Sequence, residues 1–171
     1  FLNGELVGSH NGGYTGFMVP LTQLRFNGTD VLEVKVNNRH NESIAPLTGD
    51  FTFFGGIYRS VSLLVVDQVH FSDTKYASKG VFVHGANVGR QQAEVMVNGN
   101  LCNASSISKT LKIIAVLRDQ TGKTVGESSI SIVAGSAKNI TFQLPKINVS
   151  KPNLWSPANP YLYQVHTCII D

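Results

Sequence analysis

The chain has 171 residues, of which 42% are hydrophobic and 15% charged, and its formal net charge is +3. This length and composition allow one large or two small packed domains, and they exclude a chain that is disordered throughout. No run of 18 or more apolar residues is present, so the sequence predicts no membrane span.

Short segments with a β-strand pattern follow one another along the chain, and no segment of ten or more residues has a convincing helical pattern. The predicted strands are residues 31–36, 60–66, 80–84, 93–101, 110–118, 128–133, 137–144 and 161–170. The pair Asn98-Gly99 favours a tight hairpin, yet it falls inside one of these segments, and we expect the strand to run through it with a possible bulge. The predicted fold class is all-β.

A polar stretch at residues 72–80 separates two strand-rich regions, and we place a domain boundary between residues 67 and 68. Residues 1–67 carry four Lys/Arg against six Asp/Glu, whereas residues 68–171 carry ten against five. The basic residues of the second region are spread singly, which is typical of solvated faces. Nucleic acid is therefore not an expected partner.

Two cysteines, Cys102 and Cys168, have a spacing that suits a bridge between the two sheets of a β-sandwich. Strand alternation argues against such a bridge. If Val97 and Leu101 face the core, Cys102 faces outward, and the same reasoning turns Cys168 outward. Thiols on opposite outer faces of a sandwich about 10 Å thick cannot reach disulfide geometry, so we predict two unpaired thiols.

Motifs for other chemistry are absent or unspecific. The five histidines show no metal-ligand spacing, and neither nucleophile motifs nor phosphate-binding glycine loops occur. Five Asn-x-Ser/Thr patterns fit a glycosylation acceptor, but such matches arise easily in a chain rich in these residues. They begin at Asn27, Asn41, Asn103, Asn139 and Asn148.

One segment is more specific. Residues 49–59 read Gly-Asp-Phe-Thr-Phe-Phe-Gly-Gly-Ile-Tyr-Arg and precede an apolar run at residues 61–66. The segment joins one carboxylate, Asp50, to three aromatic rings and to a glycine pair that lets backbones pass closely. Two other segments accompany it: residues 1–15 read Phe-Leu-Asn-Gly-Glu-Leu-Val-Gly-Ser-His-Asn-Gly-Gly-Tyr-Thr, and residues 154–163 read Leu-Trp-Ser-Pro-Ala-Asn-Pro-Tyr-Leu-Tyr. Together the three segments resemble glycoside hydrolase family 2. This is the family of β-galactosidases and β-glucuronidases, and the three segments occur in family order.

The resemblance implies that residues 1–67 are the C-terminal part of a sugar-binding jelly-roll domain. It implies that residues 68–171 are an immunoglobulin-like β-sandwich domain whose last strand is missing, and that the chain is an internal segment of a larger enzyme. In this family both catalytic glutamates lie on a (β/α)8 barrel that follows the immunoglobulin-like domain. No catalytic residue is therefore expected here. Glu42 follows an asparagine, as the family's acid/base glutamate does, but it falls in a polar loop.

From local sequence alone, Asp50 reads as a turn or capping residue. The resemblance implies instead that it reaches into the active site of the barrel and accepts hydrogen bonds from hydroxyls of the sugar. In some galactosidases the matching aspartate also helps to hold a sodium ion. A carboxylate suits the first task because it only accepts and can bridge two hydroxyls. Asp50 is the one predicted substrate-binding residue. No cofactor or metal is expected in this segment, whereas a sodium or magnesium ion is possible in the parent enzyme.

Other residues of these motifs have expected structural roles. Arg59 should tie loops together directly after a buried Ile57-Tyr58 pair. Trp155 should pack between the sandwich and its neighbours. The three rings of the Asp50 segment are expected in an interface core rather than as a sugar-stacking surface. These rings are Phe51, Phe53 and Phe54.

The preferred interpretation is a non-catalytic segment of a retaining, β-galactosidase-like glycoside hydrolase that acts on terminal β-glycosides. Its expected partners are carbohydrate and the catalytic barrel of the same parent chain, with no membrane. The alternatives are a β-glucuronidase or β-mannosidase of the same family, or a free-standing carbohydrate-binding or adhesion module. The compartment stays open, with a periplasmic or secreted location favoured.

Overall fold

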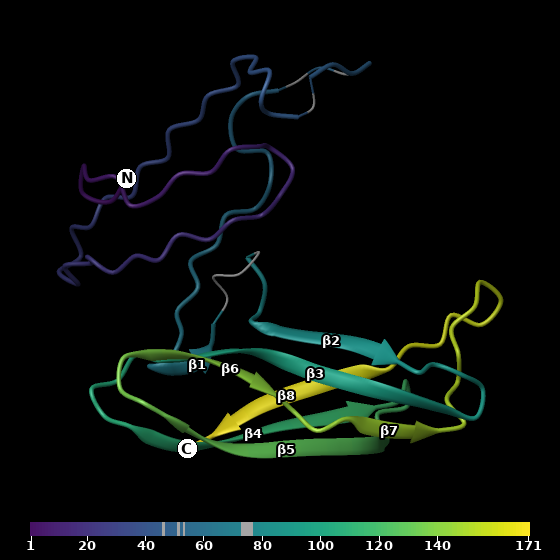
Figure 1. Ribbon diagram of the computed structural model, residues 1–171. Helices are drawn as coiled ribbons and strands as arrows, with labels where there is room; N and C mark the ends of the chain where they lie inside the picture. Colours follow the sequence, from purple (N-terminus) through teal and green to yellow (C-terminus); the bar gives the residue numbers. More distant parts are fainter. Residues whose placement is uncertain (46, 51, 53, 73–76) are drawn as a thin grey trace. The chain divides into compact units, whose positions relative to one another are not determined.

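The computed structural model describes residues 1–45, 47–50, 52, 54–72 and 77–171. Within these residues the chain forms eight β-strands and no helix, which confirms the predicted all-β class. It divides into two compact units, Phe1–Val65 and Val66–Asp171, and all eight of these strands belong to the second unit (Figure 1). None of the described residues belongs to a helix long and apolar enough to cross a membrane.

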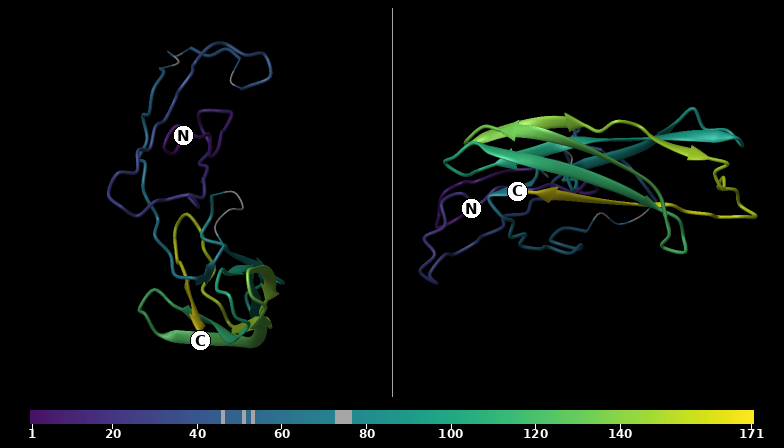
Figure 2. Two further views of the ribbon diagram at one scale, coloured as in Figure 1. Left: turned by 90° about the vertical axis from the view of Figure 1, so that its left-hand side faces the viewer. Right: turned by 90° about the horizontal axis from the view of Figure 1, so that it is seen from below.

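The strands of the second unit form two antiparallel sheets, one of five strands and one of three, which face each other as the two layers of a β-sandwich (Figure 2). In the larger sheet, β3 pairs along one edge with β1 and β2 and along the other with β6 and β7. In the smaller sheet, β4 lies between β5 and β8. The bounds are β1 Val69–Phe71, β2 Val81–Ala86, β3 Gln92–Asn103, β4 Lys109–Arg118, β5 Thr124–Ala134, β6 Lys138–Gln143, β7 Ile147–Ser150 and β8 Gln164–Ile170.

The hydrophobic core of the second unit lies between these two sheets. Alternate residues of β4 point into it, and Leu111, Ile113 and Ala115 are completely buried. From the larger sheet, Val97 and Leu101 of β3 meet them. Burial of these apolar side chains is the main stabilising contribution to the sandwich.

The six strands predicted in the second unit are all found, with ends that shift by a few residues. The short strands β1 and β7 were not predicted, because three or four residues carry too little periodicity to recognise. The two strands predicted in the first unit, at residues 31–36 and 60–66, are wrong. Residues 31–36 form a single bridge, between Leu32 and Leu2, and residues 60–66 form none. An extended apolar segment becomes a strand only when a neighbour completes its ladder, and none of the described residues does so here.

The Asn98-Gly99 pair lies in the middle of β3, which runs through it as one strand. The pairing with β2 and β6 is continuous across both residues, so no bulge forms there. The glycine is needed for packing, not for a turn. A Cβ atom at position 99 would lie 2.3 Å from the carbonyl oxygen of Gly80 and 2.8 Å from Cζ of Phe142.

We therefore expect Gly99→Ala to destabilise the sandwich by about 1–3 kcal/mol, because neither a backbone carbonyl nor a core ring can move aside cheaply. Urea unfolding followed by circular dichroism measures the change. Gly89→Ala is the matched control: the nearest atom to its new Cβ is the Gln92 carbonyl oxygen at 3.7 Å, an ordinary contact. Equal stability of the two variants would contradict the packing role of Gly99.

At the end of the sandwich near the β3–β4 turn, a buried asparagine forms hydrogen bonds to several segments of the chain. The side-chain nitrogen of Asn103 donates to the carbonyl oxygens of Ile107 and Ala134, both at 2.9 Å, and of Gly135 at 3.1 Å. Its oxygen accepts from the backbone and hydroxyl groups of Ser105 at 3.1 and 2.6 Å. Asn103 is completely buried, so one side chain links the end of β3, the following turn and the end of β5.

The two cysteines are free, as predicted. Cys102 is half-buried on β3 between the buried Leu101 and Asn103, which places it on the outer side of the larger sheet. Cys168 is exposed on β8, in the smaller sheet.

Candidate functional site

Asp50, the predicted substrate-binding residue, lies at an exposed bend of the first unit. Within the part of the chain that the structure describes, its carboxylate takes part in no hydrogen bond or ion pair. Phe51 and Phe53, two of the three rings predicted beside it, lie outside the described residues. None of the described residues therefore occupies the lone pairs of the Asp50 carboxylate.

Close backbone approaches position the segment that follows Asp50. A Cβ atom on Gly55 would lie 3.0 Å from Cγ of Asn38, so the glycine lets the loop at residues 37–43 pass near it. Gly56 has a φ of 86°, a left-handed conformation that a side chain would strain. Three residues after Gly55, the hydroxyl of Tyr58 donates a hydrogen bond to the carbonyl of Gly13. The Gly-Gly-Ile-Tyr element thus connects two loops of the first unit.

The predicted burial of Ile57 and Tyr58 is wrong, since each is 57% exposed. The hydroxyl of Tyr58 donates to the carbonyl of Gly13, and its side chain lies largely on the surface. The guanidinium of Arg59 lies 5.9 Å from the centroid of this ring, a cation–π arrangement. Phe54 is also exposed, at 79%. The element is held by polar and glycine contacts, and not by a buried aromatic core among the described residues.

The glycine-rich loop at residues 8–17 contains a stacked pair of rings that was not predicted from the sequence. The rings of His10 and Phe17 stack at 4.5 Å with an interplanar angle of 9°. The hydroxyl of Thr15 lies 3.2 Å from Nε2 of His10, within hydrogen-bond distance. The sequence showed His10 only as a histidine without metal-ligand neighbours, whereas its role here is to shape the loop that Tyr58 contacts.

Asp30 shows how a structural carboxylate differs from Asp50. It accepts hydrogen bonds from the Asn3 amide at 2.8 Å and from the backbone nitrogens of Arg25 and Phe26 at 3.1 and 3.2 Å. These bonds, first among them the one from Asn3, lower the pKa of the Asp30 carboxyl below its ordinary value. Its lone pairs are used within the chain, so Asp30 orders the first unit and is not a candidate for binding sugar.

Glu42 occupies an exposed turn, as the sequence predicts. The side-chain oxygen of Asn41 accepts a hydrogen bond from the backbone nitrogen of Ser43 at 2.9 Å, and the carbonyl of Asn41 accepts one from Ile44. The Asn-Glu pair therefore belongs to an asparagine-stabilised turn. It is not part of a catalytic strand end.

The described residues contain no group of three or more His, Cys, Asp or Glu side chains that could hold a metal ion. Sodium and magnesium take several oxygen ligands, and Asp50 would contribute only one carboxylate. The described side chains alone therefore do not assemble a site for sodium or magnesium.

Comparison with known proteins places this site in context. The family model described as Glycosyl hydrolases family 2 matches residues 79–171, more than half of the chain. A β-glucuronidase from Bacteroides fragilis is 35% identical over 167 residues, which are 96% of this chain and 24% of that protein. The β-galactosidase BoGH2A from Bacteroides ovatus is 29% identical over 171 residues, 99% of this chain and 19% of that protein.

Among solved structures, Bacteroides uniformis β-glucuronidase 2 covalently bound to cyclophellitol-6-carboxylate aziridine has a TM-score of 0.93 and 35% identity. The match covers 99% of this chain and 20% of that one. The chain thus spans only between 19% and 24% of the length of these relatives. The resemblance drawn from the sequence motifs is confirmed, and the chain belongs to glycosyl hydrolase family 2.

Proposed function

We propose that this chain is a non-catalytic segment of a longer retaining glycoside hydrolase that cleaves terminal β-glycosides. The observation that carries the proposal is the pattern of coverage: similarity extends over nearly all of this chain but over a quarter or less of each relative. Retaining hydrolysis needs two carboxyl groups about 5–5.5 Å apart, which we assign to a catalytic barrel in the rest of the polypeptide.

Within this proposal, residues 1–67 belong to a sugar-binding jelly roll and residues 68–171 to an immunoglobulin-like sandwich. The antiparallel two-layer arrangement of the second unit supports the latter assignment. Both regions would support the barrel, and the first would present Asp50 to it. The Asp50 carboxylate accepts no hydrogen bond from the described residues, whereas Asp30 accepts several, and this contrast supports a role of Asp50 toward a ligand.

For the sugar, the proposal holds two candidates. The family motifs favoured a β-galactoside, and BoGH2A is a relative with that activity in its name. A β-glucuronide has at least equal support, because the relatives at 35% identity are β-glucuronidases and one of them is bound to a 6-carboxylate compound. Asp50 is compatible with both sugars. In a glucuronide it would have to face ring hydroxyls, since two like charges repel at close distance.

Activity assays test this function directly. The 171-residue chain and the longer protein encoded by the same reading frame are each incubated with nitrophenyl β-galactoside and nitrophenyl β-glucuronide. We expect no turnover by the 171-residue chain and clear turnover of one substrate by the longer protein, and the preferred substrate selects between the two sugars. Turnover by the 171-residue chain, or a reading frame without a barrel, would contradict the proposal and favour a free-standing module.

A further inference from the structure

The chain contains four Asn-Gly pairs, which begin at Asn3, Asn11, Asn27 and Asn98. This dipeptide is prone to spontaneous deamidation, because glycine has no Cβ atom to keep its backbone nitrogen away from the preceding side-chain amide. The reaction also requires that the asparagine side chain and the backbone after it can rotate until these two groups meet. The surroundings of each pair therefore decide whether it reacts.

Two of the pairs are held by hydrogen bonds that oppose this rotation. The side-chain nitrogen of Asn3 donates to the carboxylate of Asp30 at 2.8 Å, and its oxygen accepts from the backbone nitrogen of Val31 at 3.0 Å. Asn98 lies within β3, whose pairing with β2 and β6 is continuous across Asn98 and Gly99. Reaction at either position first requires that these bonds break.

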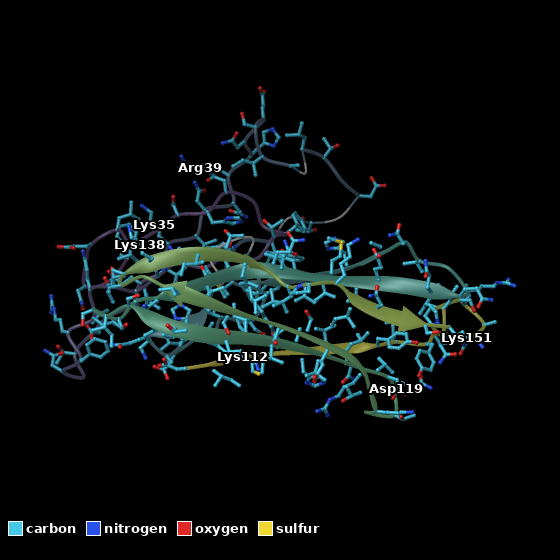
Figure 3. All side chains as sticks on the ribbon, turned by 60° about the horizontal axis from the view of Figure 1, so that its bottom comes forward. Lys35, Arg39, Lys112, Asp119, Lys138 and Lys151 are labelled. Atoms are coloured by element: carbon cyan, nitrogen blue, oxygen red, sulfur yellow. The ribbon has the colours of Figure 1, made fainter. Side chains whose placement is uncertain are left out.

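A third pair, at Asn27, is fixed by a turn. The side-chain oxygen of Asn27 accepts from the backbone nitrogen and the hydroxyl of Thr29 at 3.1 and 2.7 Å. The same arrangement occurs in the turn between β4 and β5, where Asp119 accepts from the backbone nitrogen and the hydroxyl of Thr121 at 2.9 and 2.6 Å (Figure 3). These bonds to the residue two positions on are typical of ordered Asx turns, so the Asn27 side chain is also restrained.

Asn11 differs from the other three asparagines. Asn11 and Gly12 are both exposed, and within the part of the chain that the structure describes neither the Asn11 side chain nor the Gly12 backbone nitrogen forms a hydrogen bond. Gly12 has a φ of 101°, and apart from its chain neighbours no atom lies within 4 Å of the position that a Cβ atom would take. The amide and the backbone nitrogen can therefore rotate toward each other, and a ring has room to form.

We infer that Asn11 is a site of spontaneous deamidation, with water as the co-reactant and ammonia as the leaving group. The backbone nitrogen of Gly12 loses its proton to hydroxide and attacks the side-chain carbonyl carbon of Asn11. The new C–N bond closes a succinimide ring while the bond to the amide nitrogen breaks, and this nitrogen takes up a proton and leaves as ammonia. Water then opens the ring at either carbonyl, which gives aspartate or isoaspartate.

The products change a loop that the rest of the first unit contacts. Both products add a negative charge directly after His10, whose ring stacks on Phe17. Isoaspartate also lengthens the backbone next to Gly13, whose carbonyl accepts the hydrogen bond from Tyr58. The inference is independent of the proposed function, since the reaction needs neither a sugar nor a catalytic barrel.

Peptide mass spectrometry tests the inference on the longer protein encoded by the same reading frame, incubated in mildly alkaline buffer with and without urea. In urea the four pairs should react at similar rates, because glycine follows each asparagine. In the folded protein we expect Asn11 to keep this rate. Asn3 and Asn98 should react about tenfold more slowly or less, and a tenfold change corresponds to about 1.4 kcal/mol of activation free energy. Fragmentation of the peptides assigns each modified residue and separates aspartate from isoaspartate.

The variant Asn11→Gln is the control, because its longer side chain closes the corresponding ring far more slowly. We expect the modification of the peptide that holds residues 10–15 to disappear in this variant, and its persistence would overturn the inference. A rate at Asn11 that folding lowers as much as the rate at Asn3 would also overturn it, as would faster reaction at Asn27. Aspartate without isoaspartate would exclude the succinimide and contradict the proposed reaction. None of these results depends on whether the longer protein hydrolyses glycosides.

Discussion

Replacing Asn103 by alanine is expected to destabilise the β-sandwich by about 2–5 kcal/mol. The loss comes from the groups that the amide leaves behind. The carbonyl oxygens of Ala134 and Gly135 would lose the Asn103 donor, that of Ile107 would keep only the Ser105 hydroxyl, and the backbone nitrogen of Ser105 would lose its acceptor. Asn103 is completely buried, so water cannot take over these bonds without opening the end of the sandwich.

Asn103→Asp separates the loss of hydrogen bonds from the cavity that alanine creates. The carboxyl group has nearly the same shape, but when ionised it only accepts, and it would face the carbonyl oxygens that the amide nitrogen now contacts. We expect this variant to be at least as unstable as Asn103→Ala at neutral pH, because a buried charge without a donor is costly. Stability retained in Asn103→Asp would mean that packing, and not hydrogen bonding, holds this end of the sandwich.

Chemical denaturation followed by circular dichroism gives the free energies of unfolding, and Asn100→Ala is the matched control. Asn100 also lies on β3, but the hydrogen bond of its side chain is exposed: the amide oxygen accepts from the Thr141 hydroxyl at 3.1 Å. An exposed bond of this kind contributes about 0.5–1.5 kcal/mol or less. If Asn103→Ala and Asn100→Ala unfold at the same urea concentration, the buried hydrogen bonds of Asn103 contribute no more to the free energy of unfolding than the exposed bond of Asn100.

Features that depend on local alternation could be predicted from the sequence. The outward orientation of Cys102 follows from its position between two core-facing residues of one strand, and the exposed position of Cys168 follows in the same way. The passage of β3 through Asn98-Gly99 was also predictable from the pattern on both sides. The need for glycine at position 99 could not be predicted, because it arises from the close contact with Gly80 and Phe142, which are distant in sequence.

Features that depend on tertiary partners could not be predicted. Asn103 appears in the sequence only as the first residue of an Asn-Ala-Ser pattern, and its burial results from the meeting of β3, the next turn and β5. Residues 60–66 have strand-forming composition but lack a paired neighbour among the described residues. The exposure of Ile57 likewise depends on what packs against it, and not on its own hydrophobicity. For Asp50, the local sequence gave a turn residue, and only the family motif suggested contact with sugar.

Asp50→Asn, made in the longer enzyme, is expected to preserve the fold and to lower kcat/KM by about one to two orders of magnitude. The amide is nearly isosteric, but it offers one acceptor oxygen and one donor where the carboxylate offers two charged acceptors, so one sugar hydroxyl loses its partner. A hydrogen bond to a charged group contributes roughly 1.5–3 kcal/mol, and each 1.4 kcal/mol corresponds to about a factor of ten. In the structure Asp50 is exposed and bonds to none of the described residues, so its replacement should not disturb the first unit.

The way in which this loss divides between kcat and KM shows whether the hydrogen bond from Asp50 stabilises the transition state or only the bound substrate. If the hydrogen bond strengthens as the sugar ring distorts toward the oxocarbenium-like transition state, kcat falls together with kcat/KM; if it only anchors the bound substrate, KM alone rises. Steady-state kinetics on the preferred nitrophenyl glycoside decide between the two. Glu42→Gln is the matched control, because it makes the same acid-to-amide change in an exposed turn of the same unit and should have almost no effect. A large loss of kcat/KM in Glu42→Gln together with an unchanged kcat/KM in Asp50→Asn would refute Asp50 as the contact to sugar. The carboxylate required for activity would then be that of Glu42.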